Sequence, residues 1–434
     1  FGWYIFPKHN DDGIHADGIY LHLEIEQDPD DSISPLIGDN TVLSFECSPQ
    51  LEPIADIVLA DYLANAEQQV IQLTSADKSL IDKHTYRYSN KSLNVNVLCN
   101  QTLSEVGYIK VYAKKNGAKK QVGLLCICPN NITRKAVIQP VLMRSSNLKP
   151  EGGHGKLQLY PTHEELSHYI QHHFLHQALV QVEVKPYQEF RLHELYNDPT
   201  VTEEARNSIV TLIRSHKQTL DTVEPIERYL AGIDRQVNDD FMGIFTGQLR
   251  SVYAKLTGDN TETNQSQTYV FFTDYRINSS QGGEIAGRAE RNVPDEQEII
   301  QCREDNQCNH WKNTAVIFEN AGDIQGLLHT TIHELGHSFG LAHTYLLIDE
   351  EQDYKDGNME KFENPYYLRR AKTDNIMDYT FVDGKQIGQF IDNPYKGKMF
   401  SLFKWQWDKI HNDINLTKSI GVAKWDILNC LSYH

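Results

Sequence analysis

The chain has 434 residues, of which 40% are hydrophobic and 23% charged, and its net charge is −18 at pH 7. This length supports two or three domains with cores of their own, and the composition is ordinary for a globular protein. The acidity argues against nucleic acids and anionic membrane surfaces as partners. No apolar run reaches the roughly 18 residues of a membrane-spanning helix, and the opening FGWYIFPKHN lacks the pattern of a signal peptide.

The first third of the chain is predicted to be β-structure. In its first run, Ile19, Leu21 and Leu23 alternate with other residues, which is the period of a strand. Turn-like pieces such as KKNGAKK separate several of the runs. The expected strands cover 19–27, 41–48, 92–99, 108–115, 121–128 and 135–143. We therefore expect an all-β, sandwich-like module over residues 1–145, built as one or two small domains.

A linker and a second domain are predicted to follow. The segment SSNLKPEGGHGK is rich in Gly, Pro and Ser, so residues 146–156 are expected to be a linker. The second domain would cover 157–434, which makes the fold class α+β. Helices are expected at 162–177, where Thr162 and Glu165 have capping-box spacing, and at 202–218, 225–256, 324–339 and 400–410. Strands are expected at 179–185, 268–277 and 314–320.

The seven cysteines do not form a dense disulfide framework, and their odd number leaves at least one unpaired. Cys302 and Cys308 are spaced to close a small loop. Cys126 and Cys128 alternate with Ile127 in an apolar run, which favours a buried strand. The redox compartment therefore stays open.

The most informative segment is HELGHSFGLAH at residues 333–343. His333 and His337 are four residues apart, so on a helix both rings leave the same face and can bind one ion. Glu334 projects beside that position, where it can take a proton from water. Gly340 can adopt φ > 0 and end the helix, which would bring His343 to a third ligand position. Three protein ligands with an open fourth position are typical of catalytic zinc.

Other metal-binding constellations are weaker. His329 lies four residues before His333, but three ligands on a straight helix cannot reach one ion, so we expect a core histidine. The ladder His168, His172 and His176 meets the same objection, and a packed or solvated face is favoured. The acidic segment 348–364 could suit calcium, but it lacks EF-hand spacing, and a solvated loop is favoured.

A second motif, TDNIMDY, covers residues 373–379. Together the two motifs resemble those of the metzincin zinc peptidases, HExxHxxGxxH and a later Met-turn. Within that clan, HELGHSFGLAHTY and NIMDY are most similar to the pappalysin (cytophagalysin) branch, although the segment between His343 and Met377 lacks the cysteines of typical pappalysins and has only one proline. The resemblance implies that Met377 lies beneath the metal as a packing residue and is not a ligand. It also implies that Tyr379 reaches the metal or the developing oxyanion.

The resemblance further implies a twisted mixed sheet over helices, with an antiparallel edge strand above the cleft. TAVIFEN at 314–320 is our candidate for that edge strand, where an extended peptide could add as another strand; the alternative is an ordinary buried strand. The expected function is that of a zinc-dependent endopeptidase. His333, His337 and His343 would hold one zinc ion, and Glu334 would act as general base.

Two other functions remain open at this stage. The β-rich module could perform the main function by binding a target or a larger assembly, with the metal domain acting on one narrow target as a delivered effector. Alternatively, the zinc domain could hydrolyse a non-protein amide such as a cell-wall peptide bond. We expect a protein or peptide substrate and an enzyme secreted or delivered outside the producing cell, although no signal peptide is visible.

Overall fold

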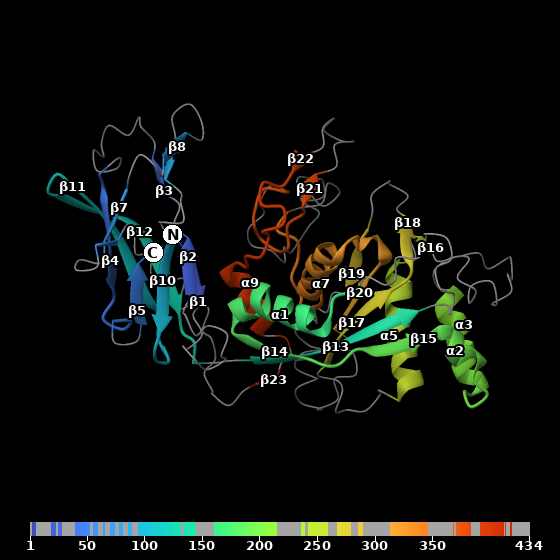
Figure 1. The fold of residues 1–434 in the computed structure, drawn as a ribbon. Helices are drawn as coiled ribbons and strands as arrows, with labels where there is room; N and C mark the ends of the chain where they lie inside the picture. The colour runs from blue at the N-terminus through green and yellow to red at the C-terminus, as the bar shows by residue number, and fades with distance from the viewer. Residues whose placement is uncertain are drawn as a thin grey trace, which may run out of the picture. The chain divides into compact units, whose positions relative to one another are not determined.

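The computed structural model divides the chain into two compact units, Phe1–Thr133 with Ser419–His434, and Arg134–Lys418 (Figure 1). The structure describes residues 2–5, 19–22, 25–27, 40–52, 55–59, 64–65, 70–73, 78–80, 86–88, 94–131, 134–144, 160–214, 236–238, 242–258, 267–278, 285–289, 313–345, 368, 370–382, 391–411, 413 and 417–418. Among these residues, no helix is both long enough and apolar enough to cross a membrane.

In the first unit, the described residues form strands and no helix. The largest sheet has the order β1 (Gly2–Ile5), β12 (Ala118–Cys128), β11 (Gly107–Lys115), β4 (Val42–Cys47), β7 (Val70–Gln72) and β6 (Ala64–Asn65). A second sheet consists of β2 (Ile19–His22), β10 (Asn94–Cys99) and β5 (Ala55–Leu59). A third consists of β3 (Ile25–Gln27), β9 (Tyr86–Tyr88) and β8 (Lys78–Leu80). The strands predicted at 41–48, 92–99, 108–115 and 121–128 are therefore confirmed, whereas the run 19–27 forms two strands, β2 and β3, in different sheets. The sandwich arrangement stays a prediction.

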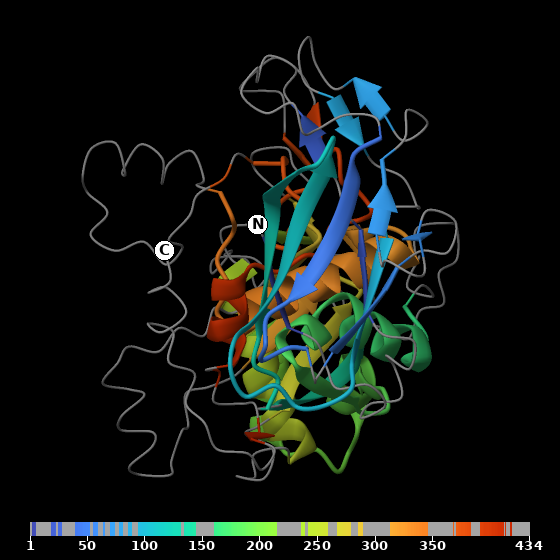
Figure 2. The same cartoon turned by 90° about the vertical axis from the view of Figure 1, so that its left-hand side faces the viewer.

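The longest strands of this unit show why the sequence forms them. In β11, Ile109, Val111 and Ala113 are buried while alternate residues are more exposed, so one face of the strand contributes to the core. Asn116 and Gly117 join β11 to β12 with φ of 51° and 82°, as a two-residue type I′ hairpin turn requires. Figure 2 shows β4, β11 and β12 running side by side.

The second unit is built on a mixed sheet. Its order is β14 (Val180–Val184), β13 (Arg134–Arg144), β17 (Gln267–Thr273), β20 (Thr314–Ile317) and β19 (Gly287–Ala289), with β15 (Gln188–Arg191) and β23 (Thr417–Lys418) also paired to β13. Strands β14, β13, β17 and β20 are parallel, and β19 is antiparallel to β20. Two small pairs complete the strands of this unit: β16 (Gln236–Asn238) with β18 (Arg276–Asn278), and β21 (Phe381–Val382) with β22 (Ile391–Asp392).

This sheet corrects two predictions. The strand expected at 135–143 does not belong to the N-terminal module, because β13 lies inside the second sheet, between β14 and β17. The boundary predicted at 145 therefore falls too late, and the second unit begins at Arg134. The segment 314–320 is not the edge strand either. Its β20 residues are fully buried between β17 and β19, and the antiparallel edge is β19.

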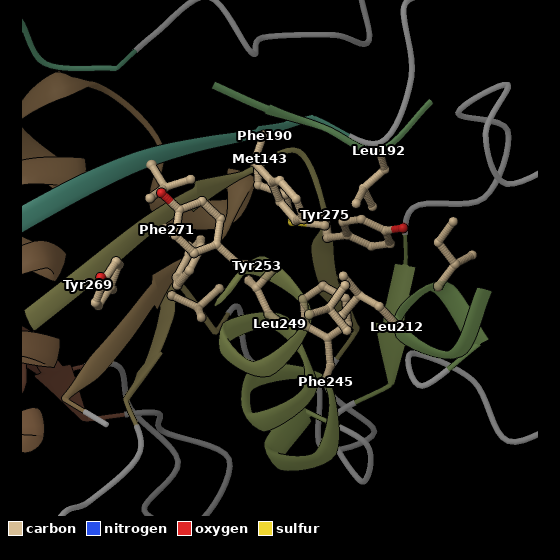
Figure 3. Close-up of a cluster of buried hydrophobic side chains, with 14 of the residues drawn as sticks. Met143, Phe190, Leu192, Leu212, Phe245, Leu249, Tyr253, Tyr269, Phe271 and Tyr275 are labelled. Atoms are coloured by element: carbon tan, nitrogen blue, oxygen red, sulfur yellow. The ribbon is translucent and has the colours of Figure 1, made fainter. Parts of the chain in front are cut away.

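Helices cover both faces of this sheet. They are α1 (His163–His173), η3 (Leu175–Ala178), α2 (Leu192–Asn197), α3 (Glu203–Arg214), α5 (Met242–Thr257), η6 (Glu319–Ala321), α7 (Ile324–Ser338) and α9 (Lys404–His411). Because the pleat alternates, β17 sends Tyr269 and Phe271 into a cluster with Leu249 and Tyr253 of α5 (Figure 3). Helices α1 and α7 lie outside this cluster and cover the other face of the sheet (Figure 1). Phe174, which follows α1, packs against Phe339, which follows α7.

Most other predicted elements of the second unit appear within a few residues of their expected bounds. The capping box of α1 is present, with Thr162 accepting from the Glu165 amide and the Glu165 side chain accepting from Thr162. The expected helix 225–256 is confirmed only over α5, and the prediction is wrong at Gln236–Asn238, which form the strand β16 paired with β18. Three predictions lie outside the described residues: the linker 146–156, the Cys302–Cys308 pair and the acidic segment 348–364. Cys126 and Cys128 are buried, as predicted.

Candidate metal centre

Helix α7 carries the first two histidines, and its start and position are set by local chemistry. Asp323 caps the helix, with its Oδ1 accepting from the amide of Gly326 at 2.8 Å. A Cβ on Gly326 would lie 2.2 Å from the carbonyl oxygen of Ala321, so only glycine fits in this first turn. Three apolar residues of the helix, Leu328, Ile332 and Leu335, are buried and anchor it in the core. The predicted helix 324–339 is therefore confirmed to within one residue.

The helix ends in a Schellman motif at Gly340. The amide of Gly340 donates to the carbonyl of His337 at 2.9 Å, and the amide of Leu341 donates to the carbonyl of Gly336 at 2.9 Å. Gly340 has φ of 85°, which an L-residue adopts only with strain. The chain therefore reverses here as predicted, and His343 returns toward the helix that it has just left.

The three motif histidines converge on one point. One ring nitrogen from each of His333, His337 and His343 lies within 4.8 Å of the other two. The Nε2 atoms of His337 and His343 are 3.1 Å apart. Two nitrogens bound to one tetrahedral zinc ion, with Zn–N bonds of about 2.0–2.1 Å, would lie about 3.3 Å apart. The donor set and its spacing therefore fit a metal ion.

Backbone carbonyls select the ring nitrogen that faces this point. The Nδ1 of His333 lies 2.8 Å from the carbonyl oxygen of Ile376, and the Nδ1 of His337 lies 2.8 Å from that of Leu341. A carbonyl oxygen can only accept, so each Nδ1 carries the proton and each Nε2 keeps a lone pair. Burial also holds the pKa of His333 below its usual value, which favours the neutral ring that binds metals.

Met377 packs against the helix between the two ligand positions. It is fully buried, and its sulphur lies 2.5 Å from where a Cβ on Gly336 would stand. The fourth residue of HELGH, Gly336, must therefore be small. Met377 is thus a buried packing residue against α7.

Asp378 holds the turn in shape. Its buried carboxylate accepts from the amides of Ala371, Lys372 and Thr373 at 2.7–3.0 Å, and from the amide of Tyr379 at 2.8 Å. Four amide bonds to one carboxylate bind the loop that precedes the turn to the turn itself. The position of Tyr379 is therefore determined by its neighbour as well as by packing.

Two tyrosines surround the third histidine. The ring of Tyr345 stacks on that of His343 with centroids 5.0 Å apart, and the ring of Tyr379 meets His343 edge-on at 5.0 Å. Tyr379 is also 5.9 Å from His333 by ring centroids. Burial raises the pKa of Tyr379, so at neutral pH its phenol keeps the proton and can donate it in a hydrogen bond.

Glu334 lies against the edge strand β19. A Cβ on Gly287 would lie 2.5 Å from the Cγ of Glu334 and 2.9 Å from its Oε1, so the strand approaches the carboxylate closely. The backbone of Ala289 also hydrogen-bonds the carboxylate. Burial raises the pKa of Glu334 to about 8, because the loss of hydration outweighs the opposing effects of the Arg288 charge and the Ala289 hydrogen bond. The side chain is only 7% exposed.

The rival histidines do not form a comparable site. In the described part of the chain, His333, His337 and His343 are the only three His, Cys, Asp or Glu side chains placed to share an ion. His329 is not among them, and burial lowers its pKa to about 4. The ring of His172 lies 4.1 Å from that of His168 and 6.3 Å from that of His176, so the ladder does not converge.

A small hollow in this unit lies away from the histidines. It is lined by Met143, Phe272 and Ile317 at the carboxyl ends of parallel strands and by Leu327 in the second turn of α7. Leu327 precedes His333 by six residues, about 9 Å along the helix. The hollow therefore lies at the carboxyl end of the parallel strands and is not part of the candidate metal centre.

Sequence reasoning missed several residues of the centre. Gly287 and Ala289 belong to a three-residue strand whose composition, GRA, gives no strand signal. Gly336 and Asp378 lie inside the two motifs, but no structural role was predicted for either residue.

No family model matches this chain, and no curated protein matches it.

Proposed function

We propose that this chain is a zinc-dependent endopeptidase whose metal centre is formed by His333, His337 and His343. The observation that carries the proposal is the convergence of three imidazoles, two of them with Nδ1 protons held by carbonyls, beside a buried carboxylate on the same helix. Three neutral nitrogen ligands suit zinc. When bound, zinc supplies Lewis-acid chemistry, polarising a carbonyl and making water a better nucleophile at neutral pH.

Glu334 is the proposed general base. It follows the first ligand on α7, and β19 and Gly287 restrict where its carboxylate can lie. A cation beside it would lower its pKa from the value of about 8 set by burial, so that it can accept a proton from water near neutrality. The same carboxyl group can then return that proton to the leaving amine.

Tyr379 is the proposed hydrogen-bond donor to the oxyanion. Its phenol is protonated at neutral pH, and its ring borders both His333 and His343. A donor that meets developing charge stabilises the transition state more than the bound substrate.

The edge strand β19 is the proposed guide for the substrate backbone. It is antiparallel to β20, and no other described strand pairs with its outer side. An extended peptide could hydrogen-bond to that side and pass in front of Glu334, which contacts the same strand. This arrangement favours an internal stretch of polypeptide as substrate.

The test is hydrolysis of a mixed peptide library by the zinc-loaded protein, with the new amino termini sequenced. Glu334→Gln should keep zinc and fold but lose about 10²–10⁴-fold in rate. Glu164→Gln on the exposed side of α1 is the matched control and should retain full activity. A zinc-loaded wild type that cleaves no peptide would favour the narrow-target or non-protein amide alternatives. A Glu334→Gln variant with more than about a tenth of wild-type turnover would remove Glu334 as the base.

A further inference from the structure

Arg370 places a positive charge on the two tyrosines that border the metal centre. Its guanidinium carbon lies 4.5 Å from the ring centroid of Tyr379 and 5.3 Å from that of Tyr345. Both distances are within the range of cation–π attraction. Both rings also contact His343, with centroids 5.0 Å away. The two tyrosine rings thus lie between Arg370 and His343, and each of them contacts both residues.

The backbone next to Arg370 is held in a strained conformation. Ala371 is fully buried and has φ of 54°, a left-handed value that is strained for a residue other than glycine. The Asp378 carboxylate oxygen that accepts from the Ala371 amide at 2.7 Å also accepts from the Tyr379 amide at 2.8 Å. The same Asp378 oxygen therefore holds the backbone of Ala371 close to that of Tyr379. This restrains the position from which the Arg370 guanidinium contacts the Tyr379 ring.

The guanidinium is oriented by the rings. Its buried Nε has no hydrogen-bond partner among the described residues, so directional hydrogen bonds at that atom do not set its orientation. The attraction to the ring faces is the interaction that the structure shows for this side chain. The charge is then in place to hold the Tyr379 ring against His343 and to strengthen the phenol as a hydrogen-bond donor.

We propose that Arg370 is a positioning residue that acts through Tyr379, holding its phenol at the metal centre. The inference rests on the proposed function insofar as Tyr379 serves as the oxyanion donor. Two other roles predict different behaviour. An Arg370 that bound a substrate carboxylate would act mainly on KM and independently of Tyr379. An Arg370 that merely filled space would be replaced without loss by a side chain of similar length.

The kinetic test is a double-mutant cycle on the zinc-loaded protein. Arg370→Met keeps length and removes charge, and it should lower kcat about tenfold with little change in KM or zinc content. Arg370→Lys should recover part of that loss. In a Tyr379→Phe background, Arg370→Met should cost little more, because its target is gone. Lys372→Met, an exposed position in the same loop, is the matched control and should behave as wild type.

A second measurement reports on Tyr379 without using activity. With 3-fluorotyrosine incorporated at the 22 tyrosines, the ¹⁹F NMR signal of Tyr379 is the one lost in Tyr379→Phe. Arg370→Met should shift that signal and Lys372→Met should not. If the wild type cleaves no peptide while the signal shifts, the positioning role stands and the peptidase proposal fails. An unmoved signal, a loss in KM alone, or rate losses that multiply in the double variant would overturn the inference.

Discussion

The sulphur of Met377 lies 2.5 Å from the point where a Cβ atom on Gly336 would stand. The contact joins the two motifs of the chain, because Gly336 lies between the helical histidines and Met377 lies in the turn whose Ile376 carbonyl orients His333. The packing of one motif therefore depends on the absence of a side chain in the other.

Gly336→Ala should destabilise the protein by about 1–3 kcal/mol, because the new methyl overlaps a buried sulphur in a close-packed site. Urea unfolding measures the change. The double variant Gly336→Ala with Met377→Ala gives the methyl room, so its cost should be smaller than the sum of the two single costs. Costs that simply add would show that the two side chains do not compete for the same space.

Gly287→Ala should reduce peptide hydrolysis at least about tenfold while leaving zinc content unchanged. The added Cβ would overlap the Cγ of Glu334, and moving the base away from its position costs rate without touching the ligands. Ala289→Gly on the same strand removes a methyl and keeps the backbone amide, so it is the matched control. Loss of zinc in Gly287→Ala would instead show that β19 supports the ligands themselves.

One zinc ion should remain bound to each dialysed chain, and His337→Ala should remove most of it. The ligand nitrogens of His337 and His343 are already at the spacing of a shared ion, so losing one of three imidazoles dismantles the site. Elemental analysis checks both statements. His329→Asn on the same helix should retain the metal, because His329 is outside the cluster. Equal zinc losses in the two variants would show that His329 is also a ligand.

His411 should make the protein less stable as the pH falls from 6.5 to about 4. Burial lowers its pKa in the folded chain from 6.5 to about 4, while its Nε2 donates to the carbonyl of Ala178. In that pH window the unfolded chain binds a proton that the folded chain does not, so acidification favours unfolding. The stabilising effect at stake is about 3 kcal/mol, from roughly 1.4 kcal/mol per pKa unit.

Urea unfolding at pH 7 and pH 4.5, with His411→Gln beside the wild type, isolates this effect. Other titrating groups are common to both proteins and cancel in the difference. The advantage of the wild type over the variant should shrink on acidification. A difference that stays constant between the two pH values would show that His411 titrates normally in the folded protein.

Local chemistry made much of the metal centre predictable. The period of His333 and His337 and the left-handed requirement at Gly340 are properties of a helix and its end, and the structure places both as expected. Tyr379 and Met377 could be placed only by resemblance. Nothing within a few residues of them says that their turn folds back under α7.

The unpredicted features depend on contacts between distant segments. The sequence of β13 has the same apolar strand pattern as the strands of the first unit. Only its pairing with β17, more than a hundred residues later, assigns it to the second sheet. Strand β19 is three residues long, and it is identified as the antiparallel edge only by its register with β20. A strand pattern reveals the period of one segment but carries no information on its partner.

The acceptors that orient His333 and His337 are main-chain carbonyls, at Ile376 and Leu341. Every amino acid has such a carbonyl, so no substitution at either position deletes the acceptor. The side chains there can be changed, as packing allows, while the two Nε2 atoms keep their lone pairs. Mutational tolerance at these two buried positions should therefore depend on side-chain volume and polarity and on keeping the amide N–H, not on a particular side-chain acceptor, and a saturation library scored for zinc retention would test this.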